Sequence, residues 1–290
     1  MNGSSHRSIL GTVVCGVNSS KLIFSRGYSG IDSREREWVM ARPGELDRYH
    51  QEVLAALRGI GDPNYGAAVA RDRGSSLEHL GISFPALRAR VRQGFSFYGL
   101  DELETLAVWD HLWRTSPYGD VLFAALEYYA PRIRKRADPE LWPVVRHWPK
   151  RVDNWCHCDG LSSLYSWILA REPAVYPQLK LWNRAPDVWL RRISIVSLIH
   201  YSGKNAVFLP LGRALPLVTA CLDDEREQVQ KAVGWVLREL GNAYPNELRA
   251  YLEKHAGTLR PVALSRAIER LEPAAKAELR SLRRRARVLS

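Results

Sequence analysis

Apolar residues recur at helical spacing along most of the chain. The first such segment follows Glu45 and ends before a pair of glycines, with apolar side chains at Leu46, Tyr49, Val53, Leu54 and Leu57. The same spacing predicts later helices at 66–73, 84–94, 101–115, 119–134, 138–148, 153–171, 175–183, 187–201, 207–221, 225–242, 245–254 and 260–271. Prolines and glycines lie at or near most of the predicted ends. Since no segment alternates as a strand does, the pattern predicts an all-α fold.

Two segments repeat at a fixed offset. Residues 190–198 superimpose on residues 229–237 with a shift of 39 positions, and a basic residue, Arg192 or Lys231, occupies the same place in each. A period near 40 is typical of HEAT-like helix pairs, which stack into a solenoid with a concave face. The pattern therefore predicts a HEAT-like solenoid, and an irregular helical bundle is the alternative.

Composition narrows the class of protein. The 290 residues are 46% hydrophobic and 25% charged, which is typical of a globular protein. No stretch approaches the roughly 20 apolar residues that span a bilayer, and the apolar run at 8–17 is only a weak imitation of a signal peptide. Four cysteines exclude a disulfide scaffold and favour a reducing compartment. We therefore expect a cytoplasmic protein without membrane attachment.

The net charge of +11 points to an anionic partner, most simply nucleic acid. The excess is uneven: residues 276–290 carry six basic side chains and one acidic one, and residues 1–40 carry five and three. Three parts are predicted. Residues 1–40, rich in Ser and Gly, are a disordered or upstream extension, residues 41–275 form the helical domain, and residues 276–290 form a basic C-terminal tail.

Several familiar catalytic and metal-binding motifs are absent. The chain has no glycine-rich phosphate loop, no HExxH and no CxxC. The run Cys156-His157-Cys158 resembles a metal cluster, but successive helical residues point about 100° apart and cannot converge on one ion. We predict neither a metal nor a cofactor.

Two helical stripes combine tryptophan with charged side chains. Trp155 and Asp159 are four residues apart and share a helix face, and Lys231, Trp235 and Arg238 lie along another stripe. Such stripes could form a site with aromatic and charged groups. The alternative is structural, with packing tryptophans, an aspartate hydrogen-bonded near a helix end and solvated surface arginines.

A third segment, Asp187-Val-Trp-Leu-Arg-Arg192, places Trp189 three residues before Arg192. With this segment and the two stripes, the sequence resembles the DNA alkylation repair family over about residues 45–272. These are the AlkD-type glycosylases, which are built from HEAT-like repeats. The sharpest matches are Trp155-x-x-x-Asp159, residues 187–192, and the string Gln230-Lys-Ala-Val-Gly-Trp-Val-Leu-Arg-Glu239. Weaker support comes from Leu80-Gly-Ile-Ser-x-Pro85, Ala124-Ala-Leu126 and Leu264-Ser-Arg266.

The resemblance implies an activity and roles for particular residues. Family members excise positively charged N3- and N7-alkylpurines from duplex DNA without a metal or other cofactor. Trp155 and Trp235 match the two pocket tryptophans, Asp159 matches the catalytic carboxylate, and Arg192 matches the arginine that contacts phosphate. A tyrosine that the family places in its N-terminal repeat has no clear counterpart, because Tyr65 lies a few residues too early.

We therefore expect a monomeric, nucleoid-associated DNA glycosylase for base excision repair of alkylation damage. Lys231 and Arg238 are weaker candidates for contacts with the DNA backbone. The resemblance further implies that the concave face grips the backbone while Trp155, Asp159 and Trp235 contact the exposed sugar. One alternative is a non-catalytic HEAT-repeat protein that binds damaged or branched DNA. The other is a protein-interaction scaffold, which would carry an apolar peptide groove instead.

Overall fold

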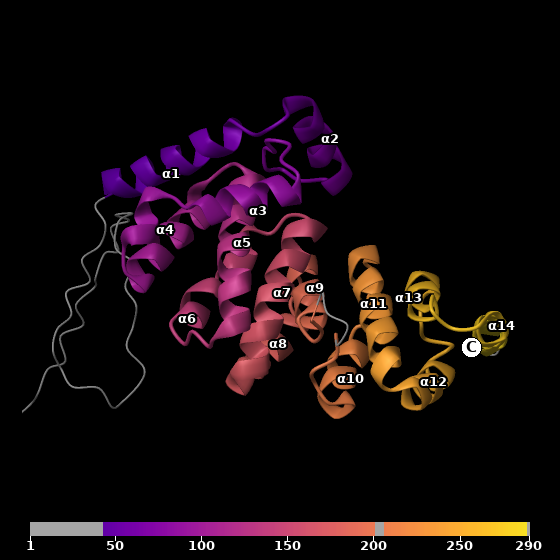
Figure 1. Ribbon diagram of the computed structural model, residues 1–290. Helices are drawn as coiled ribbons and strands as arrows, with labels where there is room; N and C mark the ends of the chain where they lie inside the picture. Colours follow the sequence, from indigo (N-terminus) through magenta and orange to yellow (C-terminus); the bar gives the residue numbers. More distant parts are fainter. Residues whose placement is uncertain (1–42, 201–205, 289–290) are drawn as a thin grey trace, which may run out of the picture. The chain divides into compact units, whose positions relative to one another are not determined.

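The structure is a computed structural model that describes residues 43–200 and 206–288 (Figure 1). The predicted extension at residues 1–40 lies outside the described residues. The described α-helices are α1 (Pro43–Arg58), α2 (Pro63–Arg73), α3 (Phe84–Gln93), α4 (Glu102–Thr115), α5 (Gly119–Lys135), α6 (Leu141–Val145), α7 (Trp155–Arg171), α8 (Tyr176–Trp182), α9 (Val188–Val196), α10 (Leu211–Thr219), α11 (Glu227–Ala243), α12 (Pro245–Lys254), α13 (Pro261–Ala267) and α14 (Pro273–Val288). The described ranges hold no strand beyond two isolated bridges, so the prediction of an all-α fold is confirmed.

The helix ends follow local sequence signals. The side chain of Asp62 accepts hydrogen bonds from two amides in the first turn of α2, and Gly74 ends that helix at a φ of 59°. At the start of α4, Asp101 and Glu104 form a reciprocal capping box. Such caps satisfy amides that have no partner within the helix, which fixes where each helix begins.

The odd-numbered helices form a continuous layer from α3 to α13. In this layer α3 contacts α5, α5 contacts α7, α7 contacts α9, α9 contacts α11, and α11 contacts α13. Even-numbered helices pack beside them, with α4 against α5, α8 against α9, and α10 and α12 against α11. The 39-residue repeat corresponds to α9 and α11, which start 39 residues apart and lie side by side (Figure 1).

Large aromatic residues fill much of the core. Trp109, Trp113 and Trp148 are fully buried, and the rings of Trp113 and Trp148 stack with centroids 4.4 Å apart. The Trp148 indole donates to Asp110 at 2.9 Å, so its polar atom is satisfied inside the protein. These tryptophans are packing residues.

Among residues 43–200 and 206–288, none of the helices has the length and apolar character that a bilayer crossing requires.

The structure differs from several of the predicted elements. The helix expected at 260–271 ends at Ala267 as α13. The helix expected at 138–148 is instead the short α6 followed by a 3₁₀ turn at Trp148–Arg151. The helices expected at 187–201 and 207–221 are shorter, because the chain between them pairs Ile199 with Val207 in a bridge. A further difference is the helix α14, which extends to Val288 and has a fully buried Leu279.

Candidate functional site

The start of α7 is fixed by Asn154. Its side-chain oxygen accepts hydrogen bonds from the amides of Cys156 and His157, both at 3.0 Å, which is the N-cap arrangement. Its amide nitrogen donates to Asp153 and to His157 Nδ1. This anchoring places Trp155 in the first turn of α7, where it remains 36% exposed.

Asp159 and Arg192 form a buried ion pair between α7 and α9. Arg192 Nε donates to Asp159 Oδ1 at 2.8 Å, and Arg192 Nη2 donates to Oδ2 at 2.9 Å. The two residues are only 6% and 5% exposed. Arg192 Nη1 also donates to the carbonyl of Gln228 in the first turn of α11, at 2.6 Å. One guanidinium therefore joins α7, α9 and α11 and holds the carboxylate in a fixed orientation.

Opposing effects act on the Asp159 carboxylate. Its burial raises the pKa of Asp159 above the ordinary value, while Arg192 and, more weakly, Arg266 lower it. Burial lowers the pKa of Arg192, but Asp159 outweighs this effect and the net change is upward. The arginine therefore remains a cation, and the carboxylate accepts a proton more readily than an exposed aspartate does.

The cations of α11 make ion pairs with acidic side chains. Lys231 Nζ lies 2.7 Å from Glu227, one turn earlier on the same helix. Arg238 Nη2 lies 3.0 Å from Glu239, and its Nη1 contacts Glu269. Trp235 lies between the two cations and packs partly buried against the core. The predicted basic stripe is therefore offset by carboxylates in this structure.

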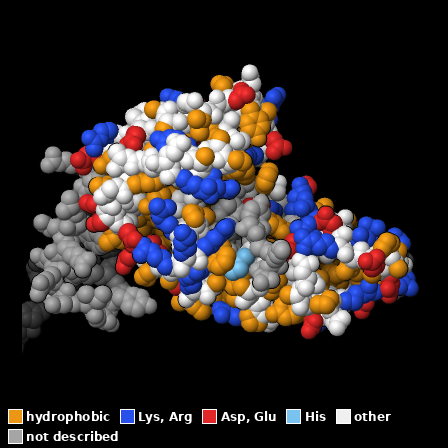
Figure 2. Space-filling model, viewed as in Figure 1, with side chains coloured by type: hydrophobic (Ala, Val, Ile, Leu, Met, Phe, Trp, Pro, Cys, Tyr) orange, Lys and Arg blue, Asp and Glu red, His pale blue; other side chains and the backbone are white. Residues whose placement is uncertain are grey.

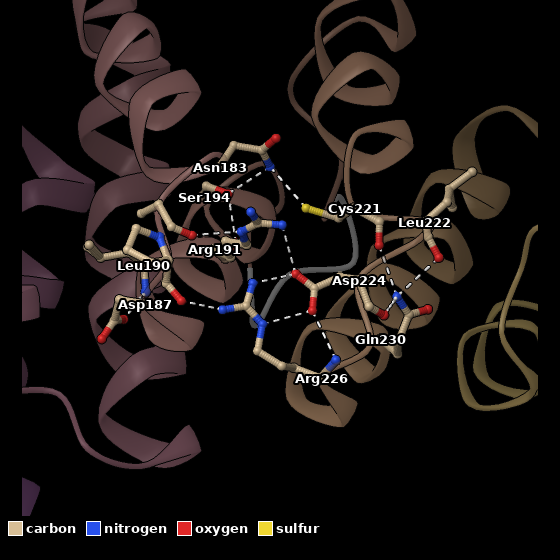
Figure 3. A network of polar contacts seen from close by, with 12 residues as sticks. Asn183, Asp187, Leu190, Arg191, Ser194, Cys221, Leu222, Asp224, Arg226 and Gln230 are labelled. Atoms are coloured by element: carbon tan, nitrogen blue, oxygen red, sulfur yellow. Dashed lines mark hydrogen bonds and ion pairs between the residues drawn. The ribbon is translucent and has the colours of Figure 1, made fainter.

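A second polar network fixes the register of α9 against α11. Arg191 donates to Asp224 at 2.9 Å, and Arg226 bonds the same carboxylate (Figure 3). The side-chain amide of Gln230 donates to three backbone carbonyls of the turn before α11, at 2.7 to 3.3 Å. Because Arg191 precedes Arg192 directly, this network also fixes the position of the buried ion pair.

The Cys-His-Cys run points in separate directions, as its spacing predicts. His157 is fully buried, donates from Nε2 to the Gly119 carbonyl at 2.9 Å and accepts from Asn154 at Nδ1. Burial lowers the pKa of His157 to about 4, so it is neutral at pH 7. Burial raises the pKa of Cys156 to about 11. Within the described part of the chain, no three His, Cys, Asp or Glu side chains are placed to hold a metal ion.

Arg266 on α13 is a site residue that the sequence analysis quoted only within a weak motif. It is exposed and lies close enough to Asp159 to affect the pKa of that carboxyl. A Cβ at Gly234 would lie 2.7 Å from Arg266 Cβ, so α11 and α13 approach closely next to Trp235. The missed signal was the glycine of the α11 motif, which permits this close approach.

Of the predicted site residues, Asp159 and Arg192 are in direct contact, and Trp155 lies one helical turn before Asp159 on α7. Lys231, Trp235 and Arg238 follow on α11, whose first turn accepts a hydrogen bond from Arg192. The site therefore extends over three consecutive helices of the odd-numbered layer, with Arg266 on the fourth.

Comparison with known proteins identifies a similar fold and a family. A predicted DNA alkylation repair enzyme from Enterococcus faecalis has a similar structure, with a TM-score of 0.62 and 16% identity, covering 73% of this chain and 97% of that one. AlkD2 from Streptococcus mutans matches with a TM-score of 0.45 and 16% identity, covering 76% and 96%. No curated protein matches in sequence. The sequence pattern described as DNA alkylation repair enzyme matches residues 53–271, about three quarters of the chain. The chain therefore belongs to the DNA alkylation repair enzyme family.

Proposed function

We propose that this protein is a monofunctional DNA glycosylase that acts as a monomer on duplex DNA, without a cofactor. Its substrates are positively charged N3- and N7-alkylpurines, which it releases by hydrolysing the N-glycosidic bond. The observation that carries the proposal is the buried carboxylate of Asp159, held by Arg192 one turn from the exposed indole of Trp155. Membership of an alkylation repair family supports the choice of substrate.

The proposed reaction needs one carboxylate and one water molecule. An alkylated purine already carries positive charge, so it departs with the bonding electrons as a neutral base. The deoxyribose is left with oxocarbenium character, which the Asp159 anion stabilises. Water then adds to C1′ and releases a proton to solvent. Because the leaving group needs no protonation, a site with a single carboxylate is sufficient.

Arg192 leaves Asp159 able to act on a substrate. A bidentate arginine occupies one lone pair on each carboxylate oxygen, and one lone pair on each remains. The guanidinium has five N–H groups, of which three are used by Asp159 and Gln228. The other two lie on Nη1 and Nη2, where the guanidinium also interacts with Cys158 and only a small part of Arg192, 5%, is exposed to a phosphate. We propose that Arg192 positions Asp159 and, through this exposed part, bridges it to the DNA backbone.

The tryptophans and the other cations support this centre. The indole faces of Trp155 and Trp235 attract a cationic nucleotide by about 0.5–2 kcal/mol each. We propose that Lys231 and Arg238 contact phosphates, which would replace the carboxylates of Glu227 and Glu269 as their partners. Each exchange substitutes one ion pair for another, so these two residues contribute less to affinity than unpaired cations would.

The test is release of 7-methylguanine or 3-methyladenine from methylated duplex DNA under single-turnover conditions. We expect both bases to be released faster than from the same DNA without protein. Binding to the duplex without release would instead support the non-catalytic DNA-binding alternative. Neither binding nor release would favour a protein-interaction scaffold.

A further inference from the structure

The charges of α14 are divided between two faces of the helix. Glu278 pairs with Arg249 of α12. On the side turned to α13, Arg283 Nε donates to the Leu259 carbonyl at 2.8 Å, and Leu279 is fully buried beside it. These contacts fix α14 on the end of the helix stack, so its arginines are presented from a folded element. Figure 2 shows Lys and Arg side chains on this end of the molecule.

Between α13 and α14 lies a hollow of about 280 Å³ with a basic wall. It is lined by Pro261, Leu264, Ser265, Arg280, Arg283 and Arg284. Arg280 and Arg284 are exposed, and neither makes an ion pair within the described residues. They differ in this from Lys231 and Arg238, which already have acidic partners. A phosphate could therefore bind these two guanidinium groups without first displacing a carboxylate.

We propose that this hollow binds a backbone phosphate of duplex DNA beside the lesion, with Arg280 and Arg284 as the contacting groups. The proposal rests on the proposed function of the Asp159 site. Arginine forks match the geometry of phosphate oxygens, the Ser265 hydroxyl adds a donor, and Pro261 and Leu264 give the lining an apolar part that suits the deoxyribose. The α14 helix follows residue 271, where the family match ends, so this contact would be an addition to the family core.

The position of the hollow connects it to the catalytic site. Ser265 lines the hollow, and its neighbour Arg266 acts electrostatically on Asp159. A duplex strand that reaches Asp159 along α13 would therefore meet the hollow next.

Other anionic ligands fit less well. Leu279, on the apolar side of α14, is fully buried against the protein, so this side chain is not available to insert into a lipid surface. None of the lining residues is aromatic, so a free nucleotide would find no ring on which to stack its base. In duplex DNA the bases remain stacked on each other, so the strand needs only the phosphate contact from the hollow.

The experiment compares neighbouring arginines of one helix. Arg284 lines the hollow, whereas Arg285 is also exposed but points about 100° away. R284Q and R285Q remove the same charge with the same residue. Affinity for an undamaged duplex is measured for both, and for R280Q/R284Q, between 50 and 200 mM salt, with thermal melting as the check on folding.

Each lost phosphate contact should reduce the slope of log K against log salt by ~0.9. We expect R284Q to show that reduction and R280Q/R284Q about twice as much, so that wild type loses about tenfold more affinity than the double variant over this range. R285Q should resemble wild type. Equal effects of R284Q and R285Q would overturn the proposal, because they would reflect net charge alone.

Two further binding measurements identify the source of the phosphate. Inorganic phosphate and vesicles of phosphatidylglycerol are tested against the same variants. Loss of either interaction in R280Q/R284Q, with duplex affinity unchanged, would overturn the proposal in favour of a free anion or a membrane. Because undamaged DNA is used, failure of the glycosylase proposal is detected separately: a wild-type protein with the predicted salt slope but no base release leaves the hollow as a DNA contact.

Discussion

Asp159→Asn tests the proposed chemistry, but the ion pair with Arg192 complicates the comparison. The substitution removes the anion and leaves a guanidinium buried without its counterion, because both residues are almost inaccessible. Breaking such a pair by removing one partner costs about 3–5 kcal/mol of unfolding free energy. For a domain of this size the melting temperature should then fall by roughly 6–20 °C. A loss of activity in this variant alone would therefore be ambiguous.

A double-mutant cycle separates the two effects. D159N/R192Q replaces both charges by neutral amides that can hydrogen-bond to each other, so we expect most of the lost stability to return. Excision should not return, since losing one preorganised electrostatic contact costs about 2.7–4 kcal/mol, or roughly 10²–10³ in rate. R192Q alone leaves Asp159 buried without its counterion, so its carboxylate should be protonated at higher pH and its excision should recover only as the pH is raised.

The assays are single-turnover release of 7-methylguanine, binding to undamaged duplex and thermal melting, all on the same four proteins. The expected result is a double variant that melts near wild type, binds DNA and does not excise. If the double variant excises at near the wild-type rate, Asp159 is only a structural partner of Arg192. The catalytic assignment would then be abandoned.

Three further outcomes are expected. Arg192→Lys keeps the charge but loses the bidentate fork, so single-turnover excision should fall about 10- to 100-fold, while undamaged duplex is still bound; unchanged excision would argue against a positioning role. The raised pKa of Asp159 should make excision decline as the pH falls through a value above that of an ordinary aspartate. Stability linked to this group should instead rise as the pH falls through that window, because the folded state binds the proton more tightly; pH-rate and pH-melting profiles check both signs. Gly234→Ala should destabilise by about 1–3 kcal/mol, because its Cβ would lie 2.5 Å from the Ala263 carbonyl oxygen. The control Gly212→Ala, with nothing within 4 Å, should raise stability by about 0.4–1 kcal/mol in denaturant unfolding.

Apolar spacing, with prolines and glycines near the ends, predicted most of the helices, and the structure adds the caps that place those ends. Asp62, Gly74 and Asp101 mark helix ends by short-range hydrogen bonds and backbone conformation, which depend on residues adjacent in sequence. The α14 helix was missed because its arginines dominate the composition and hide a narrow apolar side at Leu279. Periodicity detects a wide apolar stripe more readily than a narrow one on a terminal helix.

The sequence indicated which residues belong to the candidate site, but not how they contact one another. Spacing on α7 placed Trp155 and Asp159 on one face, which depends only on helical periodicity. The bidentate contact between Asp159 and Arg192 joins residues 33 positions apart and depends on how α7 packs against α9. Spacing within one helix contains no information on that packing. The contact of Arg238 with Glu269, 31 residues later, was not anticipated for the same reason. Glu227, by contrast, lies four residues before Lys231 on α11, a pairing that spacing alone indicates.

The odd-numbered layer, in which each helix contacts its sequence neighbours in the stack, constrains how such a protein can change its length over evolution. A helix pair inserted between α7 and α9, or between α9 and α11, would separate Asp159, Arg192 and the first turn of α11. A pair added after α13 would leave all three in place. Growth at the carboxyl end is therefore the tolerant direction, and α14 occupies the position where a protein of this kind could gain or lose the proposed phosphate contacts without rebuilding the proposed catalytic centre.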